Sequence, residues 1–308
     1  MGSILSAKHY HDEDAAFAYV EKHVWPNGPV CPHCGGVDRI SKMTGSATRK
    51  GLHKCYQCRK QFTVRQGTIF ESSHVPLHIW LQAIFFVAGS KKGVSSNQLH
   101  RTLGVTLKTA WFLSHRIREA MRSDNFAPLG GEGGTVEIDE TFIGRRKGVA
   151  TPRGGSSHKV PVLSLVHRES GQCRSFVIDK ANRENILPIV EKNIARETVL
   201  MTDDGNAYRY HFADGFLGHG RINHSASEYV RGNVYTNTVE GYFSIFKRGM
   251  RGVYQWCDEK HLHRYVAEFD FRYSNRIALG CGDMERADRL LRGIVGKRLT
   301  YQTTCARA

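Results

Sequence analysis

Two Cys-x-x-Cys turns constrain the N-terminal part of this chain more than any other sequence feature. They comprise Cys31, Cys34, Cys55 and Cys58, with 20 residues between the two turns. Zinc binds four thiolates in a tetrahedron, and each turn supplies two of them from one tight loop. His33 and His53 could also act as ligands, but the four cysteines already fill the coordination shell. We therefore expect a small zinc ribbon with an N-terminal helix in residues 1–70, in which Zn²⁺ has a structural role.

The charge of the chain indicates the class of partner. Lys and Arg total 44 against 29 Asp and Glu, and a net charge of +15 favours a polyanion, of which nucleic acid is the commonest. A hydrophobic share of 40% and a charged share of 24% exclude a disordered or fibrous protein. Eight cysteines in 308 residues are too few for a disulfide scaffold, and no apolar stretch reaches the roughly 20 residues of a membrane span. We expect a cytoplasmic globular protein that is not in a membrane.

Residues 74–124 consist mainly of helix formers. A short helix is expected before Gly104, and Thr106 is a suitable N-cap for a second, longer helix. Helix, glycine turn and helix form a helix-turn-helix-like pattern. The second helix is basic, so we expect Lys108 and Arg116 to contact DNA. The alternative is an ordinary three-helix packing unit with a solvated basic face.

A glycine-rich linker over residues 125–134 separates this helical unit from the last large part of the chain, residues 135–295. There β-branched runs alternate with helical patterns up to about residue 205, after which helices dominate, and a tail follows over 296–308. The expected strands are 135–139, 160–166, 175–178 and 198–202, with a helix over 182–196. This order predicts a mixed α/β sheet with covering helices.

Three acidic residues of this last part lie on separate predicted elements. Asp139 is on the first strand, Asp203 ends the fourth strand, and Glu240 belongs to a helical pattern with an apolar face. Taken singly, each acid could serve as a cap, a turn residue or a solvated side chain. Together they could hold two divalent cations about 4 Å apart, an arrangement that catalyses in-line phosphodiester displacement. Oxygen ligands suit Mg²⁺ or Mn²⁺.

Basic residues accompany these acids. Lys247 follows Glu240 by seven residues and so returns to the same helix face, and Arg248 adds a second cation for DNA. A glycine-rich loop after the first strand carries Arg145, Arg146, Lys147 and Arg153. This loop could hold DNA, and a solvated basic loop is the alternative.

The motifs as a set resemble the DDE transposases of bacterial insertion sequences, in particular the group with an N-terminal zinc ribbon followed by an RNase H-like catalytic domain. The matching segments span residues 10–280 in the family's order. They are CPHC, CYQC, VEIDETFIG around Asp139, TDDGNAY around Asp203, INHSASEY around His224, NTVEGYFSIFKRGMRGVY around Glu240, and HLHRYVAEFDFRYSNR. The resemblance implies an α/β RNase H-like catalytic domain preceded by the zinc ribbon and the helical unit.

The metal-binding triad that the resemblance implies consists of Asp139, Asp203 and Glu240. It also implies that Lys247 contacts DNA beside the triad. Asp204 competes with Asp203, but the family's acid directly follows Thr and stands three residues before an Ala-Tyr pair, which favours Asp203. Some relatives use Asn as the third ligand, which makes Asn237 the alternative to Glu240.

The activity implied by the resemblance is cleavage at the terminal inverted repeats of a mobile element, followed by joining of the freed 3′ hydroxyls to target DNA. The zinc ribbon and helical unit would recognise the element ends, and synapsis of two ends implies a homodimer or larger assembly. Such a protein would act on the bacterial nucleoid. Two alternatives remain: a DNA-binding regulator that has lost catalysis, and an RNase H-like nuclease or resolvase without strand transfer.

Overall fold

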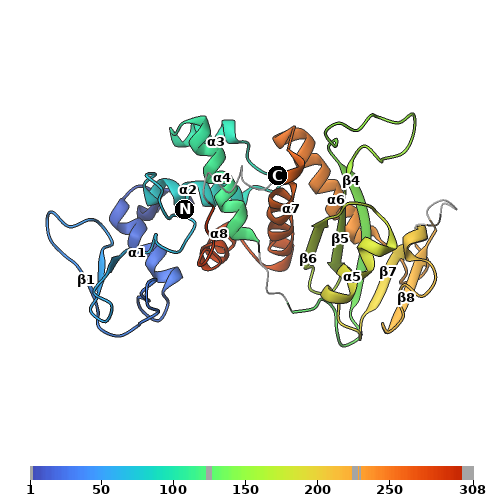
Figure 1. Ribbon diagram of the computed structural model, residues 1–308, viewed down its shortest axis with the longest axis horizontal. Coiled ribbons are helices and arrows are strands. Elements are labelled where there is room, and N and C mark those ends of the chain that lie inside the picture. The colour runs from blue at the N-terminus through green and yellow to red at the C-terminus, as the bar shows by residue number, and fades with distance from the viewer. Residues whose placement is uncertain (1–2, 123–126, 224–227, 229, 300–308) are drawn as a thin grey trace. The chain divides into compact units, whose positions relative to one another are not determined.

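The computed structural model describes residues 3–122, 127–223, 228 and 230–299, and Figure 1 shows the path of the chain. The chain divides into two compact units. The first comprises Met1–Ser90, Val94–Met121 and Gly282–Ala308, and the second comprises Lys91–Gly93 and Arg122–Cys281. Among the described residues, every helix is too short or too polar to cross a lipid bilayer.

The first unit contains a small antiparallel sheet, in the order β1-β2-β3, and several helices. Its elements are η1 (Ile4–Ser6), η2 (Lys8–Tyr10), α1 (Glu13–Val24), β1 (Ile40–Lys42), β2 (His53–Cys55), β3 (Gln61–Phe62), α2 (Leu77–Gly89), α3 (Ser96–Leu103), α4 (Leu107–Met121) and α8 (Asp283–Arg292). The sequence-based expectation of a zinc ribbon with an N-terminal helix, followed by helices, agrees with this order.

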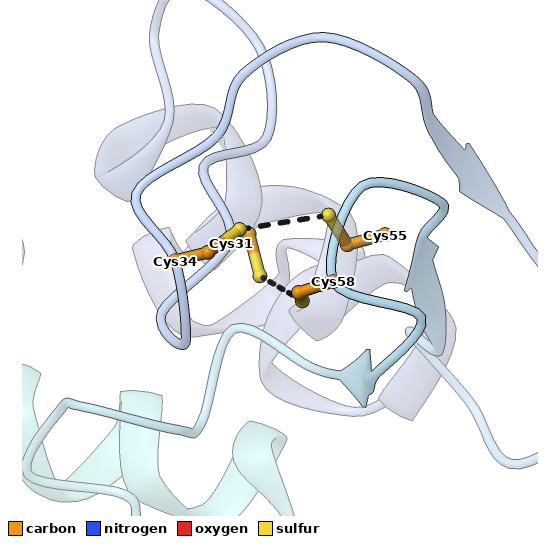
Figure 2. A group of neighbouring side chains, drawn as sticks. All are labelled: Cys31, Cys34, Cys55 and Cys58. Carbon is orange, nitrogen blue, oxygen red and sulfur yellow. Dashed lines mark hydrogen bonds between the residues drawn. The ribbon is translucent and has the colours of Figure 1, made fainter.

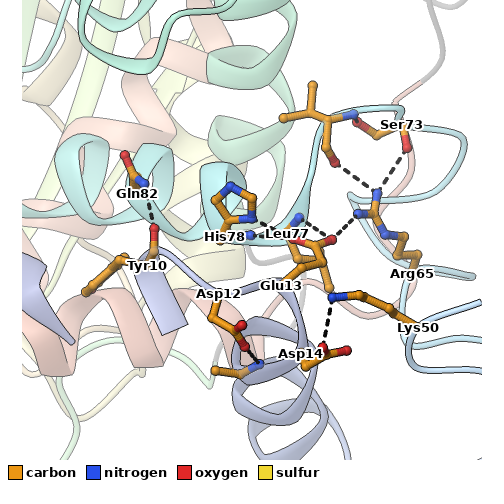
Figure 3. Close-up of polar contacts among 12 residues, drawn as sticks. Tyr10, Asp12, Glu13, Asp14, Lys50, Arg65, Ser73, Leu77, His78 and Gln82 are labelled. Carbon is orange, nitrogen blue, oxygen red and sulfur yellow. Dashed lines mark hydrogen bonds and ion pairs between the residues drawn. The ribbon is translucent and has the colours of Figure 1, made fainter. Parts of the chain in front are cut away.

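A carboxylate from α1 caps the N-terminus of α2 (Figure 3). Pro76 precedes α2 and offers no side-chain cap. Glu13 instead accepts hydrogen bonds from Leu77 N at 2.9 Å and from His78 N at 3.2 Å, and it also pairs with Arg65 at 3.1 Å. Because the first amides of a helix lack partners within the helix, this contact joins α1 to α2 as well as capping α2.

The helix-turn-helix pattern forms where the sequence predicts it. Ser95 Oγ accepts from Gln98 N at 3.1 Å and caps α3. The turn is made by Gly104, whose φ of 65° is a left-handed conformation that suits glycine. Thr106 Oγ1 accepts from Thr109 N at 3.2 Å and caps α4.

The C-terminal helix differs from the predicted division. Residues 135–295 were expected to form one domain, but α8 packs against α1 and α2 in the first unit. Tyr19 Oη on α1 donates to Asp288 at 2.5 Å, and Arg286 donates to the carbonyl of Ala88 at 3.1 Å. The apolar face of α8, which includes Leu290, is buried there. Sequence order does not reveal this return of the chain, because an amphipathic helix can cover any apolar surface.

The second unit is a five-stranded mixed sheet in the order β6-β5-β4-β7-β8. Strands β4, β5 and β6 pair antiparallel, whereas β7 and β8 continue the sheet parallel to β4. Its elements are β4 (Thr135–Ile143), β5 (Val160–His167), β6 (Cys173–Val177), α5 (Arg183–Asn193), β7 (Val199–Asp203), η3 (Asn206–Tyr208), β8 (Gly218–Ile222), α6 (Asn237–Gly249), η5 (Met250–Tyr254), α7 (Glu259–Ser274) and η6 (Ile277–Leu279). This mixed α/β sheet is consistent with the RNase H-like fold.

Alternation along β4 assigns its side chains to two layers. Val136 and Ile138 belong to the apolar cluster shared with α5. Ile143 belongs to the cluster shared with α6 and α7. Since side chains alternate along a strand, the odd-numbered residues of β4, including Glu137 and Asp139, lie on the α6 side of the sheet.

Two parts of the second unit differ from the sequence-based expectation. Strand β8 was not expected, because its sequence GHGRI contains two glycines, and pairing with β7 forms it at the edge of the sheet. The predicted flexible linker 125–134 is described from residue 127. Leu129 of this segment is buried beside α5 and exchanges backbone hydrogen bonds with Asn193 and Ala195. The tail is described only to residue 299.

Candidate functional site

The four cysteines of the zinc ribbon converge (Figure 2). Their Sγ atoms all lie within 4.8 Å of one another. The distance is 3.6 Å from Cys31 Sγ to Cys58 Sγ and 3.8 Å from Cys34 Sγ to Cys55 Sγ. A tetrahedron with Zn–S bonds of about 2.3 Å places its sulfur atoms about 3.8 Å apart. The donor set therefore fits a structural Zn²⁺ ion, with no position left for a substrate.

The apolar core around this cluster is small. It consists of Cys31, Cys55 and Phe62, with Trp25 and Ile40 packed against it. Strand β2 joins the other two strands and carries Cys55 at its end. So few apolar side chains cannot hold three short strands together by burial alone, so the metal must supply much of the local stability.

In the second unit, sheet register brings two of the three predicted acids together. Strands β4 and β7 run parallel, with Glu137 opposite Met201. Continuing this register by two residues places Asp139 opposite Asp203, at the carboxyl end of β7. Leu200 faces α5, so Asp203 lies on the α6 side, as Asp139 does.

Glu240, the third acid, is in the first turn of α6, which covers this face of the sheet. Burial raises the pKa of Asp139 well above its usual range, and the charges of Glu140, Asp203 and Glu240 raise it further. Burial also raises the pKa of Glu140 to about 7. The acids are therefore close enough to repel one another, which is the environment that a divalent cation would relieve.

The structure separates Asp203 from its competitor. Asp204 pairs with Arg209 at 3.2 Å and with Arg221 at 3.4 Å. Asp203 Oδ1 accepts one hydrogen bond, from Gly205 N at 2.9 Å. Asp204 is therefore neutralised by two arginines, whereas Asp203 lies beside other carboxylates. Asn237, the alternative to Glu240, is the first residue of α6, and both residues are exposed.

Glu137 has a structural role that the sequence did not reveal. Its side chain is 0% exposed. Glu137 Oε2 accepts from Thr238 N at 2.8 Å and Val239 N at 2.9 Å, and Oε1 accepts from Thr238 Oγ1 at 2.8 Å. Because these amides belong to the first turn of α6, Glu137 fixes the start of the helix that carries Glu240. The sequence signal was an acid two positions before Asp139, and therefore on the same face of the strand.

Arg168 completes this anchor from the turn after β5. Its Nε donates to Glu137 Oε1 at 2.6 Å, and its other nitrogens donate to the carbonyls of Asn233 and Tyr235. The guanidinium also lies 3.6 Å from the ring centroid of Tyr235. Arg168 thus holds the segment that leads into α6, and its charge balances that of the buried Glu137.

The predicted DNA contacts on α6 lie near its C-terminal end. Lys247 is half-buried, with its Nζ 5.9 Å from the ring centroid of Phe243. Arg248 is exposed, and its guanidinium donates to the carbonyl and the hydroxyl of Ser244. His224 of the INHSASEY motif lies outside the described residues.

Of the two basic residues predicted to contact DNA from α4, Lys108 is exposed near the start of the helix. Arg116 is a correction, because its side chain is only 4% exposed. It donates to the carbonyls of Leu299, Ile69 and Glu71 at 3.0, 2.7 and 2.7 Å. Arg116 therefore holds parts of the first unit together, and α4 can meet DNA only through its N-terminal part.

Comparisons with known proteins agree with this architecture. A family model described as an ISXO2-like transposase domain matches residues 131–274, and one described as a transposase zinc-ribbon domain matches residues 11–61. The chain is 28% identical over 266 residues to an uncharacterized protein in transposable element ISH50 of Halobacterium salinarum, a match that covers 80% of this chain and 86% of that protein.

Among solved structures, a chain of the simian T-cell lymphotropic virus intasome in complex with a PP2A regulatory subunit matches with a TM-score of 0.31 and 12% identity. That match covers 62% of this chain and 65% of the other, and it is too weak to support any argument. The two family models describe two domains of one kind of transposase, and together they match more than half of the chain. The chain therefore belongs to the insertion-sequence transposases with an N-terminal zinc ribbon.

Proposed function

We propose that the second unit is the catalytic domain of a DDE transposase, in which Asp139, Asp203 and Glu240 hold Mg²⁺ or Mn²⁺. The observation that supports the proposal is the parallel register of β4 and β7, recorded up to two residues before Asp139 and Asp203, together with the effect of Asp203 and Glu240 on the pKa of Asp139. The bound cations would stabilise charge on the attacking and leaving oxygens. The residues of the chain contribute by fixing two carboxylates on one face of the sheet and a third on α6, which covers that face.

The reaction needs no covalent link to the protein. In the first step a water oxygen bonds to phosphorus at the element end, and the bond from phosphorus to the 3′ oxygen breaks, which leaves a 3′ hydroxyl. In the second step that hydroxyl attacks a phosphodiester of the target, so one bond forms as another breaks. Lys247 and Arg248, near the end of α6, would hold the DNA backbone by charge.

The first unit would recognise the element ends. The ribbon presents basic side chains, and Lys108 lies in the exposed N-terminal part of α4, the part of a recognition helix that reaches base edges. Pairing of two ends in one complex would require at least two copies of the chain. The site of action would be the nucleoid in the cytoplasm.

The test is strand joining by the purified full chain. The substrates are a pre-nicked oligonucleotide carrying the end of the element that encodes this chain and a plasmid target, with and without Mg²⁺. Joined product should require Mg²⁺ and should be absent for Asp139→Ala, Asp203→Ala and Glu240→Ala. Asp204→Ala is the matched control, because Asp204 is already paired with Arg209 and Arg221, and it should retain joining.

Two outcomes would overturn the proposal. Binding of the ends without cleavage or joining would indicate a regulator that has lost catalysis. Cleavage without joining, even when a free 3′ hydroxyl is supplied, would indicate a nuclease or resolvase.

A further inference from the structure

Trp256, which lies shortly after the end of α6, is exposed to solvent. Trp256 is 76% exposed. The structure describes all four tryptophans of the chain, and the other three are buried or half-buried. Exposing a large aromatic ring to water is costly, because it forgoes the burial that a tryptophan ordinarily gains. A single exposed apolar side chain is normal on a protein surface. Whether Trp256 has a function therefore depends on the residues around it.

The backbone before Trp256 is irregular. The π-helix η5 (Met250–Tyr254) follows α6 directly. Gln255 then has φ 60° and ψ −51°, and Trp256 N donates to the carbonyl of Tyr254 at 2.6 Å. This is a γ-turn of the strained kind, which costs free energy at a non-glycine residue. Both π-helices and strained turns are frequent at functional sites.

Trp256 lines a hollow of about 320 Å³ in the second unit. Apolar lining residues include Phe142 and Ile143 at the end of β4, together with Met250 and Leu262. The basic lining residues are Arg145, Lys159 and Arg251. The hollow thus combines an aromatic ring, an apolar wall and several cations.

The cations of the hollow are not neutralised within the described part of the chain. Arg145, Lys159 and Arg251 make no ion pair there. Glu259, which also lines the hollow, lies 3.7 Å from Arg146 and is balanced by it. The local field therefore favours an anion next to an aromatic face, a pairing that suits a nucleotide, whose phosphate is charged and whose base stacks.

We propose that this hollow holds an unpaired base of the DNA substrate, stacked on Trp256, with its flanking phosphates held by Arg145, Lys159 and Arg251. The inference rests on the proposed function only in that the second unit works on DNA. A paired base has both faces covered by its neighbours in the duplex, so the site selects DNA that is locally single-stranded.

The geometry sets the distance of this base from the acids. Along β4, four residues separate Asp139 from Ile143, which is about 13 Å at about 3.3 Å per residue. Along α6 and η5, ten residues separate Glu240 from Met250, which is about 15 Å at 1.5 Å per residue. At the duplex rise of about 3.4 Å per nucleotide, these spans correspond to about four nucleotides of paired DNA between the acids and the hollow.

The test measures binding by the full chain without added Mg²⁺, so that no DNA is cut. Two labelled DNA duplexes of the same sequence are compared, one fully paired and one with a short run of unpaired thymines. We expect the wild-type protein to bind the second more tightly, and Trp256→Ala to reduce this preference about tenfold without changing affinity for the paired duplex. Trp256→Phe, which retains an aromatic face, should keep most of the preference.

Tyr210→Ala is the matched control, because Tyr210 is 81% exposed in the same unit and does not line this hollow. It should leave both affinities unchanged. A second readout is tryptophan emission, which single-stranded thymine oligonucleotides should quench in the wild type but not in Trp256→Phe. An equal loss of affinity for both duplexes, or no loss for either, would overturn the proposal.

This result is separable from the strand-joining test. If joining succeeds while the preference for unpaired DNA is absent or independent of Trp256, only the assignment of the hollow is wrong. If joining fails while the preference depends on Trp256, the hollow stands as a DNA site and the catalytic proposal falls.

Discussion

The zinc ribbon and the carboxylate cluster differ in how the chain brings their side chains together. In the ribbon, four thiolates come from two short turns and approach within 4.8 Å of one another. In the second unit, Asp139, Asp203 and Glu240 come from two strands and a helix that are far apart in sequence. The ribbon has almost no other core, whereas the carboxylates sit on a sheet with an apolar cluster on each face.

This contrast teaches where the stability of each site comes from. A ribbon with a minimal core depends on its metal for stability, so the four cysteines stabilise the fold by binding that metal. The sheet has an apolar cluster on each face, and it holds Asp139 where burial and the neighbouring carboxylates raise its pKa. Losing a cysteine should therefore destabilise the ribbon, whereas losing a carboxylate should relieve repulsion in the second unit.

The largest effect on stability is expected for Cys55→Ser, which removes a fully buried zinc ligand. Structural zinc contributes about 10–16 kcal/mol in isolated zinc-finger peptides, so loss of a thiolate should unfold the ribbon. Zinc content by mass spectrometry and proteolysis within residues 35–60 would report this. Cys257→Ser, which changes a cysteine outside the cluster, should keep its zinc and resist proteolysis. A Cys55→Ser protein with full zinc content would contradict the dependence.

The second effect concerns the anchor of α6. Glu137→Ala leaves Arg168 partly buried without its carboxylate, and removing one partner of a buried pair costs about 3–5 kcal/mol. Chemical denaturation would measure the loss, and hydrogen exchange should show faster opening of the first turn of α6. The control Glu169→Ala removes a mostly exposed carboxylate from the turn that carries Arg168. It should cost less than about 1 kcal/mol. Equal effects would refute the anchor.

The third effect is smaller, because Glu13 caps α2 in a more exposed setting than that of Glu137. Burial would raise the pKa of Glu13, but hydrogen bonds from Leu77 and His78 outweigh it and lower the pKa. Glu13→Ala should therefore cost about 1–2 kcal/mol at neutral pH. The wild-type advantage should disappear as the pH falls below the ordinary glutamate range, because protonation removes the charged cap.

The effect of Glu13→Ala on unfolding of the first unit is best measured in a Trp256→Phe background. The remaining tryptophans, Trp25, Trp80 and Trp111, all lie in the first unit, so their emission reports its unfolding alone. Asp14→Ala is the matched control, because its exposed carboxylate pairs with the exposed Lys50. Equal losses for the two variants, or a Glu13 effect that persists at low pH, would show that the capping contact contributes little.

The smallest effect on stability is expected for Asp139→Asn, which should stabilise the protein, whereas the three changes above destabilise it. The raised pKa of Asp139 means that the folded state without divalent cations binds its proton more tightly than the unfolded state does. Stability without Mg²⁺ should therefore fall as the pH rises above the ordinary aspartate range. Asp139→Asn should flatten this fall and melt at a higher temperature than the wild type at pH 8, while it abolishes joining. A lower melting temperature than the wild type at both pH 5 and pH 8 would contradict a destabilising charge on Asp139.

The parts of the site that were predictable from sequence are those whose geometry is local. The Cys-x-x-Cys turns define their own ligand spacing, and the zinc cluster was therefore evident before any fold was known. The Thr106 cap acts within three residues and was also evident. The four buried strands were predicted to within a few residues from their β-branched runs.

The features that were missed depend on contacts between distant segments. Arg116 looked like a DNA contact because it is basic, yet its three carbonyl partners lie more than 40 residues away. Strand β8 exists because β7 pairs with it, and not because its own residues favour a strand. The role of Glu137 depends on residues about 100 positions later.

The sequence by itself determined the zinc ligands, the helix-turn-helix-like pattern, the mixed sheet and the identity of the candidate acids. Only the tertiary structure decided which of two adjacent aspartates faces the acidic cluster, which arginines are buried, and what holds α6 over the sheet. It also placed α8 in the first unit and gathered Trp256 and three cations around one hollow. The physical reason is that caps and ligand turns act over a few bonds. Register, burial and charge pairing are instead set by whichever segments the whole fold brings into contact.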